Sequence, residues 1–224
     1  MMAVNNNVAS GGDDPRDIVL SDGTSWYLRH YANATGNGEA RAAVMVCPAL
    51  NGTREGLYNA AMALCPEELG GNPPAILIPN PFYQVYAVAA HSIGAEPVFV
   101  SATAKSGYLP DYTALPPEVL NRTAIAYLCS PSNPQGAVAS RAYWHNLLGL
   151  AEKYNFQIFA DECYSEIYRG SAPVGGLEIA ARMAADPERV VAFHSLSKRS
   201  NLPGLRSGFV AGGPRSLARI KQLR

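Results

Sequence analysis

The sequence predicts an α/β fold, a three-layer α/β/α sandwich around a mainly parallel sheet, and three observations support this prediction. Short apolar runs alternate with segments of helical periodicity from Val44 onward. The runs are nearly continuous in Val, Ile, Leu, Ala and Phe, as in strands that are buried on both faces. The composition, with 48% hydrophobic residues among 224, provides enough apolar material for one sizeable core.

The expected elements follow one another from Val44 to the end of the chain. The runs expected as strands read VMVCPAL, AILIP, EPVFV, TAIAYLCS, FQIFA, RVVAFHSL and GFVAG. The amphipathic segments expected as helices are Glu55–Leu64, Tyr83–Ile93 and Arg141–Tyr154. Gly94 is expected to end the second helix, and Ser140 is a candidate cap for the third.

Residues 1–43 differ from the rest in composition, because they are rich in Asn, Gly, Asp and Ala and show little periodicity. We expect loop or disorder over the first two dozen residues and a short helix around WYLRHY, Trp26–Tyr31. This divides the chain into a poorly defined N-terminal segment, 1–43, and a domain that spans 44–224.

Charge and cysteine content argue against several classes of partner. The 18 basic and 18 acidic residues balance, so no electrostatic argument favours nucleic acid or a membrane surface. No apolar run has the length of a membrane span, and the start lacks the features of a signal peptide. The cysteines are far apart and form no CxxC pair, so we expect buried thiols, no metal site and a cytoplasmic protein; they are Cys47, Cys65, Cys129 and Cys163.

Candidate functional residues follow the expected strands, because ligands of open parallel sheets bind beyond the carboxyl ends of the strands. Gly52, in the turn NGTRE, precedes a helix whose free N–H groups could bind an anion, although most such turns only cap a helix. In PNPFYQVY, an aromatic ring could cover a flat ligand or could simply wedge a helix against the sheet. In PSNPQG, Asn133 offers an amide, or the segment is an ordinary turn.

Two further strand ends carry charge. Asp161 follows the mainly apolar run FQIFA, where a carboxylate needs a cation or a hydrogen bond, and it is either a helix N-cap or a partner for a protonated ring nitrogen. Lys198 follows RVVAFHSL together with serines, and Arg206 lies eight residues beyond the lysine. Together these groups suit an aromatic, anionic ligand that carries a carbonyl group and a basic ring nitrogen.

The motifs NGTRE, PNPFYQVY, PSNPQG, DECYSEIY and SLSKRSNLPGLRSG, in this order, resemble those of the class I/II aminotransferases. These are fold type I enzymes that use pyridoxal 5′-phosphate, and the resemblance extends from about Val44 to Arg215. The amino-acid sequences of the motifs are most similar to those of bacterial succinyldiaminopimelate transaminases of lysine biosynthesis. The fold implied is the large domain of fold type I enzymes.

The resemblance also implies residue roles. Lys198 forms the Schiff base with the cofactor and then moves a proton between the substrate α-carbon and the cofactor C4′. Asp161 pairs with the pyridinium nitrogen, Tyr164 and Asn133 hydrogen-bond the phenolic oxygen, and Tyr83 stacks on the ring. The phosphate is held by Gly52, Thr53, Arg54, Ser195, Ser197 and Arg206. Arg199 receives no role from the resemblance, and we expect it to be solvated or ion-paired.

The chain departs from the family in its extent. Family members are much longer, and we expect a truncated chain that lacks the C-terminal small domain and its clamp for the substrate carboxylate. The implied reaction moves an amino group between an amino acid, glutamate, and a keto acid, N-succinyl-2-amino-6-ketopimelate, in a homodimer. Two alternatives stay open: another fold type I reaction such as that of a carbon–sulfur lyase, and a fragment that binds the cofactor without turnover.

Overall fold

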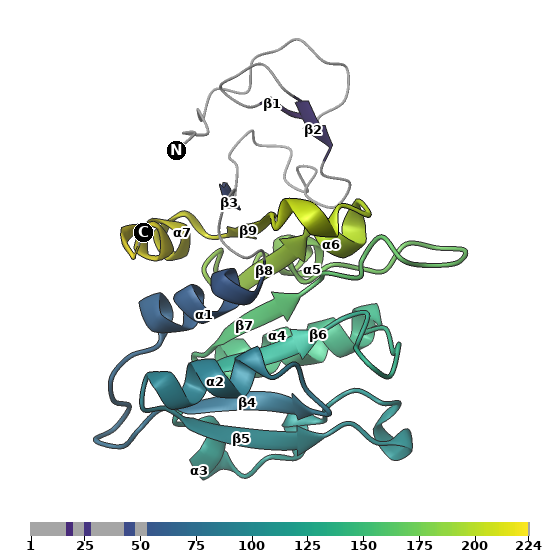
Figure 1. Ribbon diagram of the computed structural model, residues 1–224. Coiled ribbons are helices and arrows are strands. Elements are labelled where there is room, and N and C mark those ends of the chain that lie inside the picture. The colour runs from purple at the N-terminus through teal and green to yellow at the C-terminus, as the bar shows by residue number, and fades with distance from the viewer. Residues whose placement is uncertain (1–16, 20–24, 28–42, 48–52, 224) are drawn as a thin grey trace.

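The computed structural model describes residues 17–19, 25–27, 43–47 and 53–223, with side chains from Gly56 onward (Figure 1). Its centre is a seven-stranded sheet with the strand order β3-β9-β8-β7-β6-β4-β5. The strands are β3 (Ala43–Cys47), β4 (Ala75–Asn80), β5 (Glu96–Ser101), β6 (Thr123–Cys129), β7 (Gln157–Asp161), β8 (Val190–Ser195) and β9 (Gly208–Gly212). Every apolar run that was expected to be a strand contributes one of them.

The sheet is mainly parallel, as predicted. Strands β4 to β8 pair in parallel, and β9 is antiparallel to both of its neighbours, β3 and β8. The parallel strands therefore end at one common edge of the sheet, and β9 begins at that same edge. A segment that immediately precedes β9 is thereby brought beside the ends of the parallel strands.

Helices cover both faces of the sheet and complete the three layers (Figure 1). One face packs against α1 (Thr53–Leu64), α2 (Val85–Ser92) and α7 (Pro214–Gln222). The other packs against α3 (Pro117–Leu120), α4 (Arg141–Tyr154) and α5 (Gly176–Arg182). The remaining helical turns are α6 (Leu196–Arg199) and the 3₁₀ segments η1 (Ala104–Ser106), η2 (Tyr112–Ala114) and η3 (Pro203–Leu205).

The alternation of side chains along β6 shows why the strands are apolar throughout. Ile125 and Tyr127 point into the core on the α1, α2 and α7 side, whereas Ala126 and Leu128 point into the opposite core. All four are fully buried, and burial of each large side chain stabilises the fold by about 1.5–3 kcal/mol. A strand between two helical layers has no face on which polar residues could reach water.

The cap and stop residues predicted for two helices agree with the structure. Ser140 caps α4, since its hydroxyl accepts a 3.1 Å hydrogen bond from the Tyr143 amide. Gly94 follows α2 with a φ of 72°, in the left-handed region that glycine adopts without strain. The helix expected from Tyr83 begins two residues later, at Val85, because the chain leaves β4 through Pro81 and has to turn first.

One expectation for the N-terminal segment was wrong. Ser25–Tyr27 forms strand β2, paired antiparallel with β1 (Asp17–Val19), where we expected a short helix and, before it, loop or disorder. The aromatic and β-branched residues in these two segments have high strand propensity, and this preference outweighs the weak helical pattern. Residues 28–31 of the expected helix lie outside the described residues. Within the described ranges, no helix is long and apolar enough to cross a membrane.

Candidate active site

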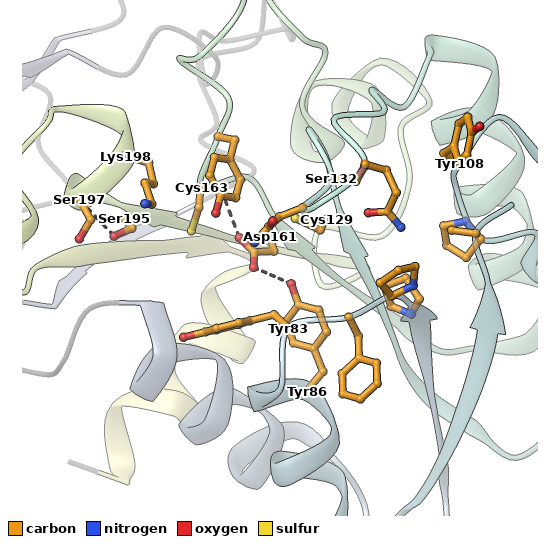
Figure 2. A pocket seen from close by; sticks show the side chains of 18 of the residues that line it. Tyr83, Tyr86, Tyr108, Cys129, Ser132, Asp161, Cys163, Ser195, Ser197 and Lys198 are labelled. Atoms are coloured by element: carbon orange, nitrogen blue, oxygen red, sulfur yellow. Dashed lines mark hydrogen bonds between the residues drawn. The ribbon is translucent and has the colours of Figure 1, made fainter. Parts of the chain in front are cut away.

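A cavity of about 350 Å³ lies at the edge where the parallel strands end (Figure 2). Its lining includes the predicted site residues Tyr83, Asn133, Asp161, Tyr164, Ser195, Ser197, Lys198 and Arg206. Gly52 lies outside the described residues. Thr53 and Arg54 begin α1, and their side chains are likewise outside the described part of the chain. The structure therefore brings together all the predicted residues whose side chains it describes.

The sheet topology explains how segments distant in sequence meet here. Tyr83 follows β4, Asn133 follows β6, Asp161 ends β7 and Lys198 follows β8. Arg206 precedes β9, and it reaches the same cavity because β9 runs antiparallel to β8. The predicted residues therefore meet beyond the carboxyl ends of the strands, as expected. The role of each residue stays a prediction.

Asp161 lies at the centre of the lining, with only 5% of its surface exposed. Its Oδ2 accepts a 2.6 Å hydrogen bond from the Tyr86 hydroxyl, and its Oδ1 accepts one of 3.3 Å from the Cys163 amide (Figure 2). Asp161 does not cap a helix, because the next helix along the chain is α5. Its carboxylate is instead held by two donors from different segments and contributes to the cavity wall.

Tyr86 is a residue of the site that the sequence analysis missed. Its ring stacks on Tyr127, with centroids 4.3 Å apart and planes 12° from parallel, so its hydroxyl has a fixed direction. Burial, and then the charge of Asp161, raises the pKa of Tyr86 well above its usual value. Tyr86 therefore stays a proton donor to Asp161. The third aromatic of PNPFYQVY, one turn after Tyr83 in a helical segment, was the available signal.

Tyr83 meets Tyr86 edge to face, with ring centroids 5.9 Å apart. In Figure 2 the two tyrosines lie on one side of Asp161, and Cys163 lies on the other side. Tyr164 also lines the cavity, and burial is the largest cause of its raised pKa. The hydroxyls of Tyr86 and Tyr164 are therefore protonated, and they can donate hydrogen bonds at neutral pH.

Lys198 lies in α6, a single helical turn that follows β8 directly. The Ser195 hydroxyl caps this turn by accepting a 3.2 Å hydrogen bond from the Ser197 amide. Figure 2 shows Lys198, Ser195 and Ser197 together at one end of the cavity, with Asp161 nearer its centre. A primary amine and a carboxylate thus face the same space from neighbouring strands.

Arg206 is placed by the turn that leads into β9. Its backbone has a φ of 48°, in the left-handed region, and its Nη1 donates to the Pro203 carbonyl at 3.1 Å and to the Ser197 hydroxyl at 3.4 Å. The guanidinium group therefore lies beside a serine of the Lys198 turn. Gly208, two residues later, lets β9 begin close to the end of β8, since a Cβ at this position would collide with the His194 carbonyl oxygen.

The cysteines are placed partly as expected. Cys129 and Cys163 are buried, but both line the cavity, whereas Cys65 is only partly buried. The Cys129 thiol donates to the Pro131 carbonyl at 3.3 Å, and burial followed by the Asp161 charge raises its pKa. At neutral pH Cys129 is therefore a protonated thiol. The side chain of Cys47 is outside the described residues.

Arg199, for which the sequence left two possibilities, is ion-paired. Its Nη1 lies 3.3 Å from Glu166 Oε1, in the segment that follows Asp161. Its guanidinium also lies over the ring of Phe209, 5.7 Å from the ring centroid.

Curated relatives of the chain include LL-diaminopimelate aminotransferases. The LL-diaminopimelate aminotransferase of Syntrophobacter fumaroxidans is 33% identical over 177 residues, which are 78% of this chain and 43% of that protein. The LL-diaminopimelate aminotransferase of Dehalococcoides mccartyi strain 195 is 34% identical over 179 residues, with the same shares of 78% and 43%. The chain therefore spans less than half the length of these relatives.

Solved structures have the same architecture. An aminotransferase from Neisseria meningitidis superposes with a TM-score of 0.75 and 39% identity over 83% of this chain and 46% of that chain. A probable N-succinyldiaminopimelate aminotransferase from Thermus thermophilus superposes with a TM-score of 0.70 and 30% identity, over 82% and 46%. These likenesses confirm the fold class predicted from the sequence.

The family comparison covers most of the chain. Residues 30–224 match the family described as aminotransferase class I and II. This family depends on pyridoxal 5′-phosphate, the cofactor that the sequence predicted. With the buried carboxylate, the lysine turn and the arginine that converge on one cavity, these matches show that the chain belongs to the class I and II aminotransferases.

Proposed function

We propose that this chain provides the cofactor site of a pyridoxal 5′-phosphate-dependent transaminase. The observation that carries the proposal is the convergence of Asp161, held by Tyr86, and Lys198, flanked by Ser197 and Arg206, on one cavity. The reaction we propose moves an amino group between glutamate and N-succinyl-2-amino-6-ketopimelate. We further propose residues 44–224 as part of the cofactor-binding large domain.

The residues that line the cavity suit this cofactor chemically. A volume of about 350 Å³ is within the range of small-molecule sites, and aromatic and apolar side chains form much of the wall. Arg206 and the two serines offer a cation and hydroxyl donors for a phosphate group. Asp161 offers a carboxylate for a ring nitrogen, and Lys198 offers an amine for a carbonyl carbon.

When bound, the cofactor supplies an aldehyde and a ring that withdraws electrons from the bonds at the substrate α-carbon. Lys198 Nζ is the amine that would hold the cofactor at its aldehyde carbon. When the substrate occupies the site, Lys198 Nζ would be free to move a proton between the substrate α-carbon and C4′ of the cofactor. Asp161 keeps the ring nitrogen protonated, because its negative charge favours the cationic form.

The other lining residues orient the ring. Tyr83 covers one ring face, and Asn133 and Tyr164 donate hydrogen bonds to the phenolic oxygen. Arg206 binds the phosphate with a planar fork of donors, which a lysine could not supply. Gly52, Thr53 and Arg54, at the start of α1, complete the proposed phosphate site. Each of these roles is part of the proposal.

The names of the relatives support a diaminopimelate-type substrate. A curated relative is called an LL-diaminopimelate aminotransferase, and a solved relative a probable N-succinyldiaminopimelate aminotransferase. We favour the succinylated substrate because the sequences of the motifs resemble those of the succinyldiaminopimelate transaminases. LL-diaminopimelate is the second candidate, favoured by the curated relatives. We also propose that the functional protein is a cytoplasmic homodimer.

The test begins with cofactor attachment. The chain is mixed with pyridoxal 5′-phosphate, reduced with borohydride and digested, and the labelled peptide is identified by mass spectrometry. We expect the label on Lys198, and a label on any other lysine would contradict the proposal.

Amino transfer is then measured with 2-oxoglutarate as acceptor and either N-succinyl-LL-diaminopimelate or LL-diaminopimelate as donor. Formation of glutamate with the succinylated donor supports the proposed substrate, and formation only with the free diamine favours the second candidate. Release of a thiol, with pyruvate and ammonia, from a cysteine S-conjugate would identify a carbon–sulfur lyase instead. Labelling of Lys198 without glutamate formation from either donor would indicate a chain that binds the cofactor without turnover.

A further inference from the structure

The turn that carries Lys198 cannot hold its position by itself. Helix α6 has four residues, and an isolated helical turn is unstable in water because nucleation is unfavourable. Successive residues of a helix point about 100° apart, so the rotation of this turn about its axis decides where Lys198 points. Whatever fixes Arg199, the next residue, therefore also fixes the direction of Lys198.

Arg199 is fixed to the segment that carries Asp161. Its Nη1 lies 3.3 Å from Glu166 Oε1, and the two side chains are only 11% and 21% exposed. Glu166 lies in the segment that follows Asp161, and two backbone hydrogen bonds fold this segment into turns. The Ser165 amide donates to the Glu162 carbonyl at 3.0 Å, and the Ile167 amide donates to the Tyr164 carbonyl at 2.9 Å. The ion pair thus ties the lysine turn to the loop that begins with the aspartate.

A second contact joins β8, the strand that leads into the lysine turn, to the same loop. His194 Nε2 lies 3.4 Å from Glu162 Oε2, and both side chains are buried. Phe209 connects the two contacts, because its ring stacks on His194 at 4.6 Å and lies beneath the Arg199 guanidinium. In the β8–β9 pairing His194 lies directly opposite Phe209, so the sheet register itself sets this arrangement.

We propose that Arg199 and Glu166 are positioning residues that aim Lys198 at the carbonyl carbon of the cofactor, an inference that rests on the proposed function. Neither residue lines the cavity, so neither is expected to touch the cofactor. Their contribution is to the geometry of one step, in which the Lys198 amine adds to the aldehyde carbon and water leaves. Binding of the phosphate and ring depends on other residues and is expected to be independent of the pair.

Two probes separate positioning from general binding. Pyridoxal 5′-phosphate carries the aldehyde that Lys198 attacks, whereas pyridoxamine 5′-phosphate carries an aminomethyl group and cannot form that bond. In Glu166→Gln we expect the dissociation constant of pyridoxal 5′-phosphate to rise about 3- to 10-fold. The dissociation constant of pyridoxamine 5′-phosphate is expected to change less than about two-fold. The rate at which borohydride fixes the label on Lys198 should fall as the dissociation constant of pyridoxal 5′-phosphate rises.

Two further variants serve as controls. Arg199→Lys keeps the charge but loses the planar group over Phe209, so we expect an effect smaller than that of Arg199→Ala. Glu152→Gln removes the partner of Arg189 in another Arg–Glu pair, 3.4 Å long, at the opposite ends of the strands. It should leave both dissociation constants unchanged. Circular dichroism of every variant shows whether the fold is retained.

The outcomes are distinct. If Glu166→Gln retains its fold and binds both compounds as tightly as the wild-type chain, the positioning role is refuted. It is also refuted if both affinities fall equally, because the pair would then support the whole site. If the wild-type chain binds neither compound, the proposed function fails, and the positioning role fails with it.

Discussion

The Tyr86 hydroxyl donates a 2.6 Å hydrogen bond to Asp161 Oδ2, across 75 positions of the sequence. Tyr86 is fully buried and Asp161 is 5% exposed, so water cannot replace this donor. A hydrogen bond to a charged group contributes about 1.5–3 kcal/mol to stability, more than one between neutral groups. The bond also occupies one carboxylate oxygen and so limits the orientations that Asp161 can adopt in the cavity.

Tyr86→Phe is expected to destabilise the fold by about 1–3 kcal/mol, because a buried carboxylate loses a donor while the ring packing is kept. Urea unfolding followed by circular dichroism measures this loss. Tyr108→Phe is the control, since Tyr108 lines the same cavity but is half exposed, and a change within about 0.5 kcal/mol is expected. Equal stability of Tyr86→Phe and the wild-type chain would mean that the bond contributes nothing.

Asp161→Asn is expected to leave the fold intact and nearly abolish amino transfer, because a neutral amide cannot keep the ring nitrogen protonated. The side chain keeps its volume and an oxygen that can still accept from Tyr86. The measurement is glutamate formation from 2-oxoglutarate, with borohydride labelling of Lys198 to show that the cofactor still binds. A near-normal rate would remove Asp161 from the mechanism.

Much of the fold could be predicted from the sequence, because its strands are continuous apolar runs with clear ends. The pattern that predicts β7 also places Asp161 at its end, and parallel pairing then brings it near Lys198. Strand β2 could not be predicted this way, because three residues are too few to show a period. Its assignment depends on pairing with β1, which is a tertiary contact.

The site was predicted less completely than the fold, for a similar reason. Tyr86 lies in a helix and looks like a core residue, and its hydroxyl has a role only because β4 and β7 lie in the same sheet. The pairing of Arg199 with Glu166 also depends on how α6 packs against the loop that follows β7. Residues with clear motif positions could be identified from sequence, whereas their partners across the sheet could not.

Gly208→Ala is expected to destabilise the chain by more than about 1 kcal/mol, because the added methyl group would collide with the His194 backbone. It should also lower the rate of labelling at Lys198, since β9 would be pushed away from the Ser195 end of β8. Gly149→Ala, inside α4, is the matched control: its Cβ would meet no atom within 4 Å. That change is expected to stabilise the chain by about 0.5–1 kcal/mol. Equal effects of the two substitutions would contradict the tight packing at Gly208.

The stability of the chain is expected to fall steeply at alkaline pH. Burial is the largest cause of the raised pKa of Tyr86 and of Tyr112, whereas in the unfolded chain tyrosine has a pKa of about 10. Below pH 10 both states keep these protons, and the stabilising effect is fully present. Above about pH 10 the unfolded state loses them while the folded state keeps them, so stability falls as pH rises towards the folded pKa values.

Each such tyrosine adds a slope of about 1.4 kcal/mol per pH unit to the loss of stability. Urea unfolding between pH 8 and about pH 11, read together with tyrosinate absorbance, measures this slope and should show ionisation accompanying unfolding. Tyr112→Phe leaves the buried ring in place and removes one ionisable proton. The loss of stability per pH unit should therefore be smaller in this variant than in the wild-type chain by about 1.4 kcal/mol. Stability that stays constant through this range, or the same slope in the variant, would show that these tyrosines ionise within the folded chain.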